Sequence, residues 1–101
     1  MPLDERLLGL RLSDIQGYMK LKFRVRERIG VIVTKVHKGG IGDRYGLHTG
    51  DLILKINNQD VEDLKHFQTL MAEGLRTNYI LFQVNRNNEV FFVPIKLDSL
   101  L

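Results

Sequence analysis

The stretch Gly46-Leu47-His48-Thr49-Gly50-Asp51-Leu52-Ile53 decides the fold of this chain. Its two glycines allow the backbone to turn tightly before an apolar run, because glycine adopts positive φ angles without steric cost. Asp51 is expected to accept backbone N–H bonds within that turn, as aspartates in turns commonly do. Leu47 and Leu52 are expected to fill the core beneath it. The stretch therefore predicts a tight connection between a short helical turn and a β-strand, made by residues that shape the scaffold.

Strand patterns continue on both sides of this turn. The segment 31–36 is β-branched throughout its first four residues, and 52–56 is an apolar run followed by the turn residues Asn57-Asn58. Near the N-terminus, Leu8, Leu10 and Leu12 alternate with other residues, which is typical of a strand. Arg86-Asn87-Asn88 predicts a hairpin, because asparagine tolerates positive φ. The predicted strands are 7–12, 31–36, 52–56, 79–84 and 90–97.

One amphipathic helix is predicted over residues 64–73. Asp63 is expected to cap its N-terminus, and Gly74 is expected to end it. Its apolar positions recur at helical spacing; they are Leu64, Phe67, Leu70 and Met71. The segment 13–23 is ambiguous, because Ile15 and Met19 favour a short helix and Gly17 weakens it.

The composition is that of one ordinary domain and excludes several classes of function. The chain has 101 residues, 44% of them hydrophobic, no cysteine, and a net charge of +3. It therefore has no disulfide framework, cysteine metal site or thiol nucleophile. The charge is too small to predict nucleic-acid binding, and no apolar run is long enough for direct membrane insertion. The basic run Arg24–Arg28 fits either a solvated loop or contact with an acidic partner.

The sequence shows no arrangement of catalytic or metal-binding residues. Ser13 and Ser99 do not lie in a nucleophile elbow. The three histidines, His37, His48 and His66, fall in separate segments without metal-ligand spacing, and no phosphate-binding loop motif is present. We therefore predict that this chain is not an enzyme and holds no cofactor or metal.

The element at 46–53, with the strand at 30–36 before it, resembles the PDZ domain family. The resemblance extends over about residues 7–97. It implies a mainly β fold with two helices, a partly open antiparallel β-barrel or sandwich capped by helices. Residues 1–101 would then be a single PDZ domain belonging to a larger protein. The run Leu12-Ser13-Asp14-Ile15, followed by Gly30-Val31-Ile32-Val33, looks most like the PDZ domains of HtrA/Do-type trypsin-like serine proteases.

The resemblance also implies a binding site for peptide C-termini. PDZ domains add a peptide as an extra antiparallel strand beside a helix and hold its carboxylate with backbone amides. The carboxylate loop would be Leu7, Leu8, Gly9 and Leu10, with the amides of Leu8, Gly9 and Leu10 facing the carboxylate. The strand pairing with the peptide would be Leu10, Arg11 and Leu12. Without the resemblance, Leu8 and Leu10 would be read as core residues.

The other wall of this site would be the predicted helix. Laying the family's helix on this sequence turns Leu64, Gln68 and Met71 toward the ligand. Phe67 and Leu70 then point into the core, and His66 falls on the outer face.

We therefore expect a peptide-binding module that recruits substrates to, or regulates, an attached serine protease. Its partners would be protein or peptide C-termini with apolar last residues, and its own protease domain. The alternatives are a regulatory or assembly domain that binds no free peptide, and a PDZ module of a secretion or signalling protein. The resemblance places the protein in the periplasm or cell envelope.

Overall fold

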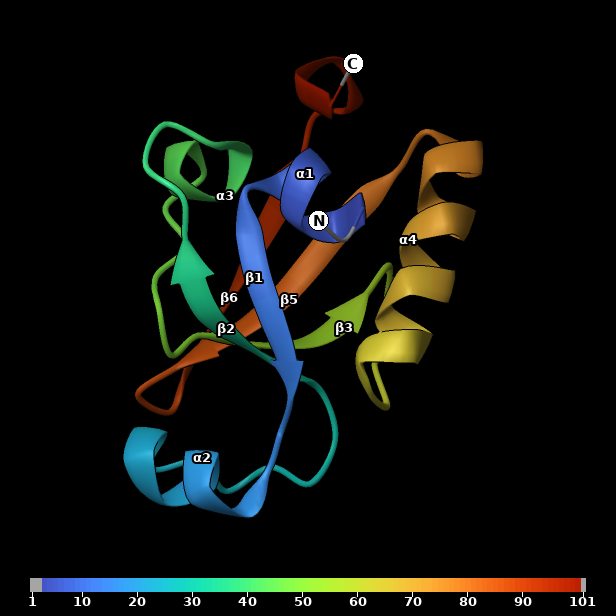
Figure 1. The fold of residues 1–101 in the computed structure, drawn as a ribbon. Helices are drawn as coiled ribbons and strands as arrows, with labels where there is room; N and C mark the ends of the chain where they lie inside the picture. The colour runs from blue at the N-terminus through green and yellow to red at the C-terminus, as the bar shows by residue number, and fades with distance from the viewer. Residues whose placement is uncertain (1–2, 101) are drawn as a thin grey trace.

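An antiparallel sheet organises the molecule in the computed structural model, which describes residues 3–100 (Figure 1). Its strands follow the order β1-β2-β3-β5-β6, and the short strand β4 pairs with β3. The strands are β1 (Leu10–Asp14), β2 (Val31–Val36), β3 (Leu52–Ile56), β4 (Gln59–Asp60), β5 (Ile80–Arg86) and β6 (Glu89–Ile95). The helices are α1 (Leu3–Leu8), α2 (Gly17–Phe23), α3 (Ile41–Arg44), α4 (Leu64–Thr77) and the 3-10 helix η1 (Leu97–Leu100).

The prediction of a mainly β fold is confirmed, but the described residues contain more helices than the two that were predicted. The N-terminal segment was wrongly predicted as strand up to Leu8, because it begins with α1 and becomes strand only at Leu10. Gly9, with φ of 63°, separates the two elements. Leu8 and Leu10 are both fully buried. Their alternation therefore reflects burial from two successive elements, which a strand pattern cannot distinguish.

The helix α4 is longer than predicted. Asp63 caps it as expected, because its side chain accepts a bond from the His66 amide at 2.8 Å. Gly74 does not end the helix, which continues to Thr77 and stops at Asn78 in the left-handed conformation. A Cβ at Gly74 would lie 2.9 Å from Ile80 Cγ1. Gly74 therefore allows α4 to pack closely on β5. The prediction that Gly74 ends the helix was wrong.

The turn before β3 has the predicted form. Gly46 and Gly50 adopt φ of 83° and 95°. Asp51 is 1% exposed, and its Oδ2 accepts a bond from the His48 amide at 2.8 Å. The sequence did not show that Arg86, at the end of β5, also donates to this carboxylate. A turn predicted from local residues is thus locked by a residue 35 positions away.

The core has two parts. The larger part contains Phe67 and Phe82, whose ring centroids lie 5.9 Å apart. It also contains apolar residues from β1, β2, β3, β5 and β6. The smaller one joins Met19 of α2 to Ile32 and Leu52. Within the ambiguous segment 13–23, residues 13–14 end β1 and the helix α2 begins at Gly17. This packing accounts for the helix, because Met19 is buried on the sheet while Leu21 stays 85% exposed.

Candidate functional site

Strand β1 has one free edge, and α4 lies beside it. Among residues 3–100, β1 is at the end of the strand order and pairs only with β2. In Figure 1, β2 lies on one side of β1 and α4 on the other. The amide of Leu64, at the start of α4, donates to Asp14 Oδ1 at the end of β1, at 2.6 Å. This bond fixes the two elements next to each other at one end.

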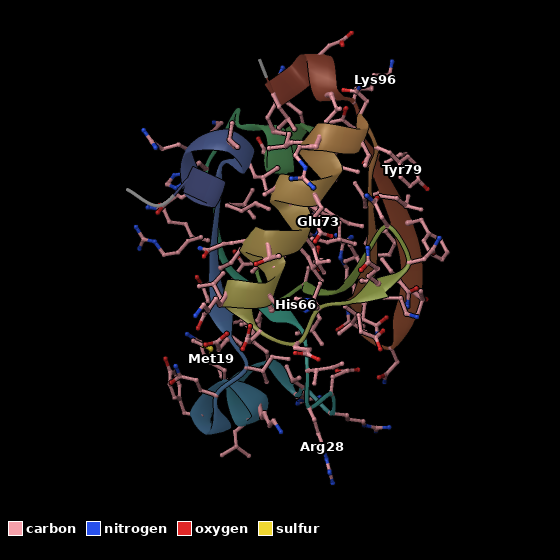
Figure 2. All side chains as sticks on the ribbon, turned by 90° about the vertical axis from the view of Figure 1, so that its right-hand side faces the viewer. Met19, Arg28, His66, Glu73, Tyr79 and Lys96 are labelled. Atoms are coloured by element: carbon pink, nitrogen blue, oxygen red, sulfur yellow. The ribbon has the colours of Figure 1, made fainter. Side chains whose placement is uncertain are left out.

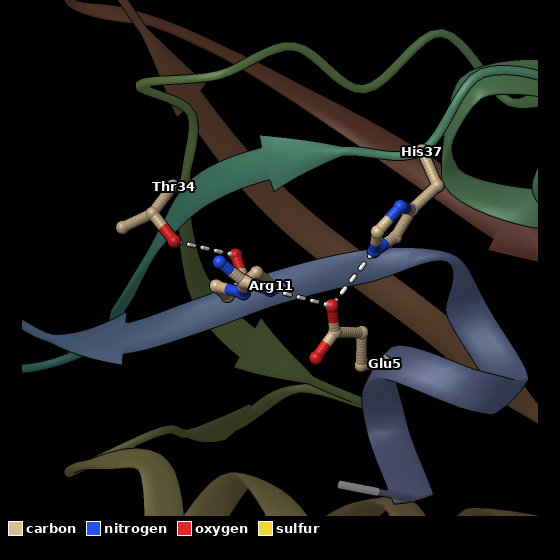
Figure 3. Close-up of polar contacts among 4 residues, drawn as sticks. All are labelled: Glu5, Arg11, Thr34 and His37. Carbon is tan, nitrogen blue, oxygen red and sulfur yellow. Dashed lines mark hydrogen bonds and ion pairs between the residues drawn. The ribbon is translucent and has the colours of Figure 1, made fainter. Parts of the chain in front are cut away.

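The hydrogen bonds of β1 show which of its backbone groups face outward. The Gly9 carbonyl accepts from the His37 amide at 2.9 Å, and the Arg11 carbonyl accepts from Thr34 Oγ1 at 3.1 Å (Figure 3). Both carbonyls therefore point toward β2. Because backbone groups alternate sides along an antiparallel strand, those of Leu10 point toward the free edge. The edge of β1 can thus accept a further strand.

The segment predicted as a carboxylate loop is built differently in part. Leu7 and Leu8 are the last residues of α1 and do not form an open loop. The Gly9 amide donates to the Glu5 carbonyl at 2.9 Å, which continues the helical pattern. The Leu8 amide lies within α1 and donates four residues back in the same way, so two of the three amides expected to face a carboxylate are engaged within the chain.

Glu5 connects α1 to both β1 and the end of β2. Its side chain is 6% exposed, and its Oε1 accepts from His37 Nε2 at 2.7 Å and from Arg11 Nη2 at 3.3 Å (Figure 3). The hydrogen bond from His37 lowers the pKa of Glu5, against the opposing effect of burial, and Arg11 lowers it further. Sequence reasoning missed Glu5 because its partner His37 is 32 residues away.

The three helix residues proposed to face a ligand differ in exposure. Leu64 is half-buried, Gln68 is exposed, and Met71 is 6% exposed within the main core. Phe67 and Leu70 point into the core as predicted.

His66 lies at the first turn of α4, as Figure 2 shows, and its Nδ1 accepts a bond from the Glu62 amide at 3.1 Å. Its ring is therefore engaged with the segment that precedes the helix.

The apolar residues predicted to line the site are mostly core residues. Leu8, Leu10 and Met71 are buried in the main cluster, while Leu7 and Leu64 are partly exposed against it. A ligand side chain arriving between β1 and α4 would therefore meet Leu7 and Leu64 first.

The described residues contain neither a candidate metal site nor a candidate membrane-spanning helix. Within residues 3–100, no group of three or more His, Cys, Asp or Glu residues could hold a metal ion. None of the helices in that range is long and apolar enough to cross a membrane.

A sequence model of the PDZ domain matches residues 32–86, which is more than half of the chain. The chain belongs to the PDZ domain family. A PDZ domain is a binding module, and its free sheet edge beside a helix is the arrangement described above for β1 and α4.

The curated relatives of this PDZ domain are HtrA-type proteases. A probable periplasmic serine endoprotease, DegP-like, of Rickettsia conorii is 26% identical over 92 residues, 91% of this chain but 18% of its own length. A serine protease Do-like HtrA of Lactobacillus helveticus is 25% identical over 97 residues, 91% of this chain and 24% of that protein. The chain thus spans about a fifth of these relatives.

Solved structures give the same assignment. The HtrA3 PDZ domain bound to a phage-derived ligand, FGRWV, superposes with a TM-score of 0.70 at 26% identity, covering 88% of this chain and 81% of that one. The HtrA-type protease AlgW with a decapeptide gives a TM-score of 0.71 at 26% identity, covering 88% and 27%. The predicted resemblance to HtrA-type PDZ domains is therefore confirmed.

Proposed function

We propose that this PDZ domain captures the C-terminal segment of a protein by strand addition at β1. The observation that carries the proposal is the free edge of β1 beside α4, with the backbone groups of Leu10 directed away from β2. A peptide placed there pairs with residues 10–12 and lays its side chains against Leu64 and Gln68 of α4. Peptide capture is supported by two related structures, the HtrA3 PDZ domain bound to a phage-derived ligand and the HtrA-type protease AlgW with a decapeptide.

The carboxylate of the ligand would be held at the junction of α1 and β1, by the amides of the segment 7–10. The Gly9 amide is bonded to the Glu5 carbonyl. Capture of a carboxylate by Gly9 therefore requires the last turn of α1 to open. The Leu10 amide needs no such change, because it already faces the free edge.

The role of the domain would be to recruit substrates to, or regulate, an attached serine protease, in the periplasm or cell envelope. This follows from the HtrA-type relatives, of which the chain represents about a fifth. The 101-residue chain itself would have no catalytic activity. A regulatory or assembly domain that binds no free peptide remains the second candidate, supported by the engaged amide of Gly9.

The proposal is tested by calorimetric titration with the peptide Phe-Gly-Arg-Trp-Val as free acid and as C-terminal amide. Hydrogen bonds to a charged group are worth roughly 1.5–3 kcal/mol, so amidation should weaken binding on the order of tenfold or more. Equal affinity of acid and amide would show that the segment 7–10 does not hold a carboxylate. Absence of binding by both, and by a library of apolar-ended peptides, would favour the second candidate.

A further inference from the structure

The positive charge of the chain is concentrated in residues 17–30, which form α2 and the loop before β2. This segment carries five of the 15 basic residues and only one of the 12 acidic residues. The rest of the chain carries ten basic and 11 acidic residues, so it contributes no net positive charge. A local excess of this kind attracts a negatively charged partner, even though the net charge of the whole chain is only +3.

The loop after α2 turns its arginine side chains toward solvent. Exposed and half-buried residues alternate over 24–28, and the exposed ones are Arg24, Arg26 and Arg28. Between them, Val25 packs against the smaller core, and Glu27 Oε1 accepts from Asn85 Nδ2 at 3.2 Å. The single acidic residue of the segment is thus turned toward the sheet. Figure 2 shows Arg28 reaching away from the body of the molecule.

The five basic side chains of this segment keep their charge available. Among the side chains that the structure describes, none of the five forms an ion pair with a carboxylate. Lys22 Nζ lies 5.4 Å from the centroid of the Phe23 ring, a contact that orients the ammonium group and leaves its charge in place.

The helix α2 also exposes apolar side chains among these cations. Met19 is buried on the sheet, and helical spacing places Leu21 about 200° around the axis from it. Leu21 is therefore 85% exposed, and Tyr18 on the neighbouring part of that face is 63% exposed. Lys20 and Lys22 lie about 100° to either side of Leu21. An exposed apolar face flanked by lysines is typical of a helix that lies in a membrane interface.

We propose that residues 17–30 form a basic surface that attaches this domain to an anionic phospholipid bilayer. The cations match the charge of the headgroups, while Leu21 and Tyr18 enter the boundary of the acyl chains and the lysine stems reach back to the headgroups. An acidic polypeptide would pair with the cations alone and would leave Leu21 in water. The attachment is peripheral, because no helix within residues 3–100 is long and apolar enough to cross a membrane.

The position of the basic surface suits contact with a flat partner. In Figure 1, α2 lies beyond one end of the sheet, and α1 lies toward the other end of β1. A bilayer can therefore contact α2 and the arginine loop while the junction of α1 and β1 stays away from it. Attachment would leave the edge of β1 open to a peptide.

The charge is tested by cosedimentation with vesicles of phosphatidylcholine alone and of phosphatidylcholine with phosphatidylglycerol. The chain should bind only the anionic vesicles, and salt near 1 M, where the Debye length is about 3 Å, should weaken this binding. Arg26→Gln combined with Arg28→Gln should weaken it at least tenfold, because each basic residue near an anionic surface contributes about fivefold. Lys38→Gln combined with Arg44→Gln, both exposed near α3, is the matched control and should weaken it less than about threefold.

The apolar contact is tested at Leu21. The chain has no cysteine, so Leu21→Cys accepts a single environment-sensitive fluorophore. Its emission should shift to the blue on addition of anionic vesicles. The same label on Glu73→Cys, exposed on α4 far from Arg28 in Figure 2, should not shift. Leu21→Ser should weaken vesicle binding at least threefold, because it removes the apolar side chain and keeps every charge.

Equal binding to neutral and anionic vesicles, an equal loss in the two double variants, or an unshifted label at residue 21 would overturn the proposal. Binding to poly-glutamate as tight as binding to anionic vesicles, and unaltered by Leu21→Ser, would overturn it in favour of an acidic protein partner. A thermal melt of each variant establishes folding. Because peptide titrations probe β1 without vesicles, failure here leaves the proposed function intact.

Discussion

Asp51 and Glu5 are both buried carboxylates paired with arginine, yet they hold their surroundings in different ways. Asp51, 1% exposed, uses both oxygens: Oδ1 accepts from Arg86 Nε, and Oδ2 accepts from Arg86 Nη2 and from the His48 amide. Among the described residues, Glu5, 6% exposed, accepts only at Oε1, from His37 at 2.7 Å and through a longer contact from Arg11 at 3.3 Å.

The two contacts differ in the groups that hold each carboxylate. Arg86 remains charged at every ordinary pH, and its hydrogen bonds to Asp51 raise its pKa further against the effect of burial. Glu5 is held mainly by its bond to His37, which lowers the pKa of the Glu5 carboxyl. The turn before β3 is therefore held by a cation that stays charged. The junction of α1 and β1, where the ligand carboxylate is proposed to bind, is held by a contact that weakens when Glu5 is protonated.

The largest effect is expected at the ion pair between Arg86 and Asp51. Arg86→Ala leaves the carboxylate of Asp51 buried with only the His48 amide as partner. Removing one member of a buried ion pair costs about 3 kcal/mol. Urea denaturation should show a loss of this size, and Asp51→Ala combined with Arg86→Ala should cost less than the sum of the two. A loss below about 0.5 kcal/mol would mean that the pair behaves as a surface salt bridge.

A smaller effect on stability, which depends on pH, is expected at Glu5. The folded-state pKa of Glu5 is lowered, so its contribution to stability is present above the ordinary glutamate pKa, about 4.3, and is lost as pH falls through the folded value. The difference in free energy of unfolding between wild type and Glu5→Gln should therefore be full at about pH 6 and shrink toward about pH 3. Glu62→Gln should show no such trend, and a constant difference for Glu5→Gln would contradict the assignment.

The smallest effect concerns selectivity at the start of α4. Leu64 has no imidazole to pair with a ligand hydroxyl, and burying an unpaired hydroxyl costs roughly 1–3 kcal/mol. The third ligand residue from the end should therefore be preferred apolar over Ser or Thr, by a partial margin because Gln68 is also near. Leu64→His should shift the preference toward Ser or Thr. His66→Ala should change little, because two helical positions rotate it about 200° from Leu64. The opposite result in a peptide library would contradict the helix register.

The sequence could predict the features that depend on neighbouring residues. The glycine-rich turn before β3, the asparagine pair at 87–88 and the cap at Asp63 all follow local backbone rules, and each has the predicted form. The helical spacing of the apolar residues also predicted correctly that Phe67 and Leu70 are buried. The family resemblance led to the prediction that the segments of β1 and α4 form the two walls of a binding site, and this stays a prediction.

The tertiary structure alone decided how the polar groups are paired. Nothing local distinguishes Glu5 or Glu27 from other acidic residues, because their partners lie 32 and 58 positions away in the chain. The same holds for Leu8, whose burial by a helix looks like burial by a strand until its neighbours are known. Turn and helix propensities act within a few residues and are written in the sequence. Hydrogen bonds between distant segments depend on how the sheet brings those segments together, and they become visible only in the folded chain.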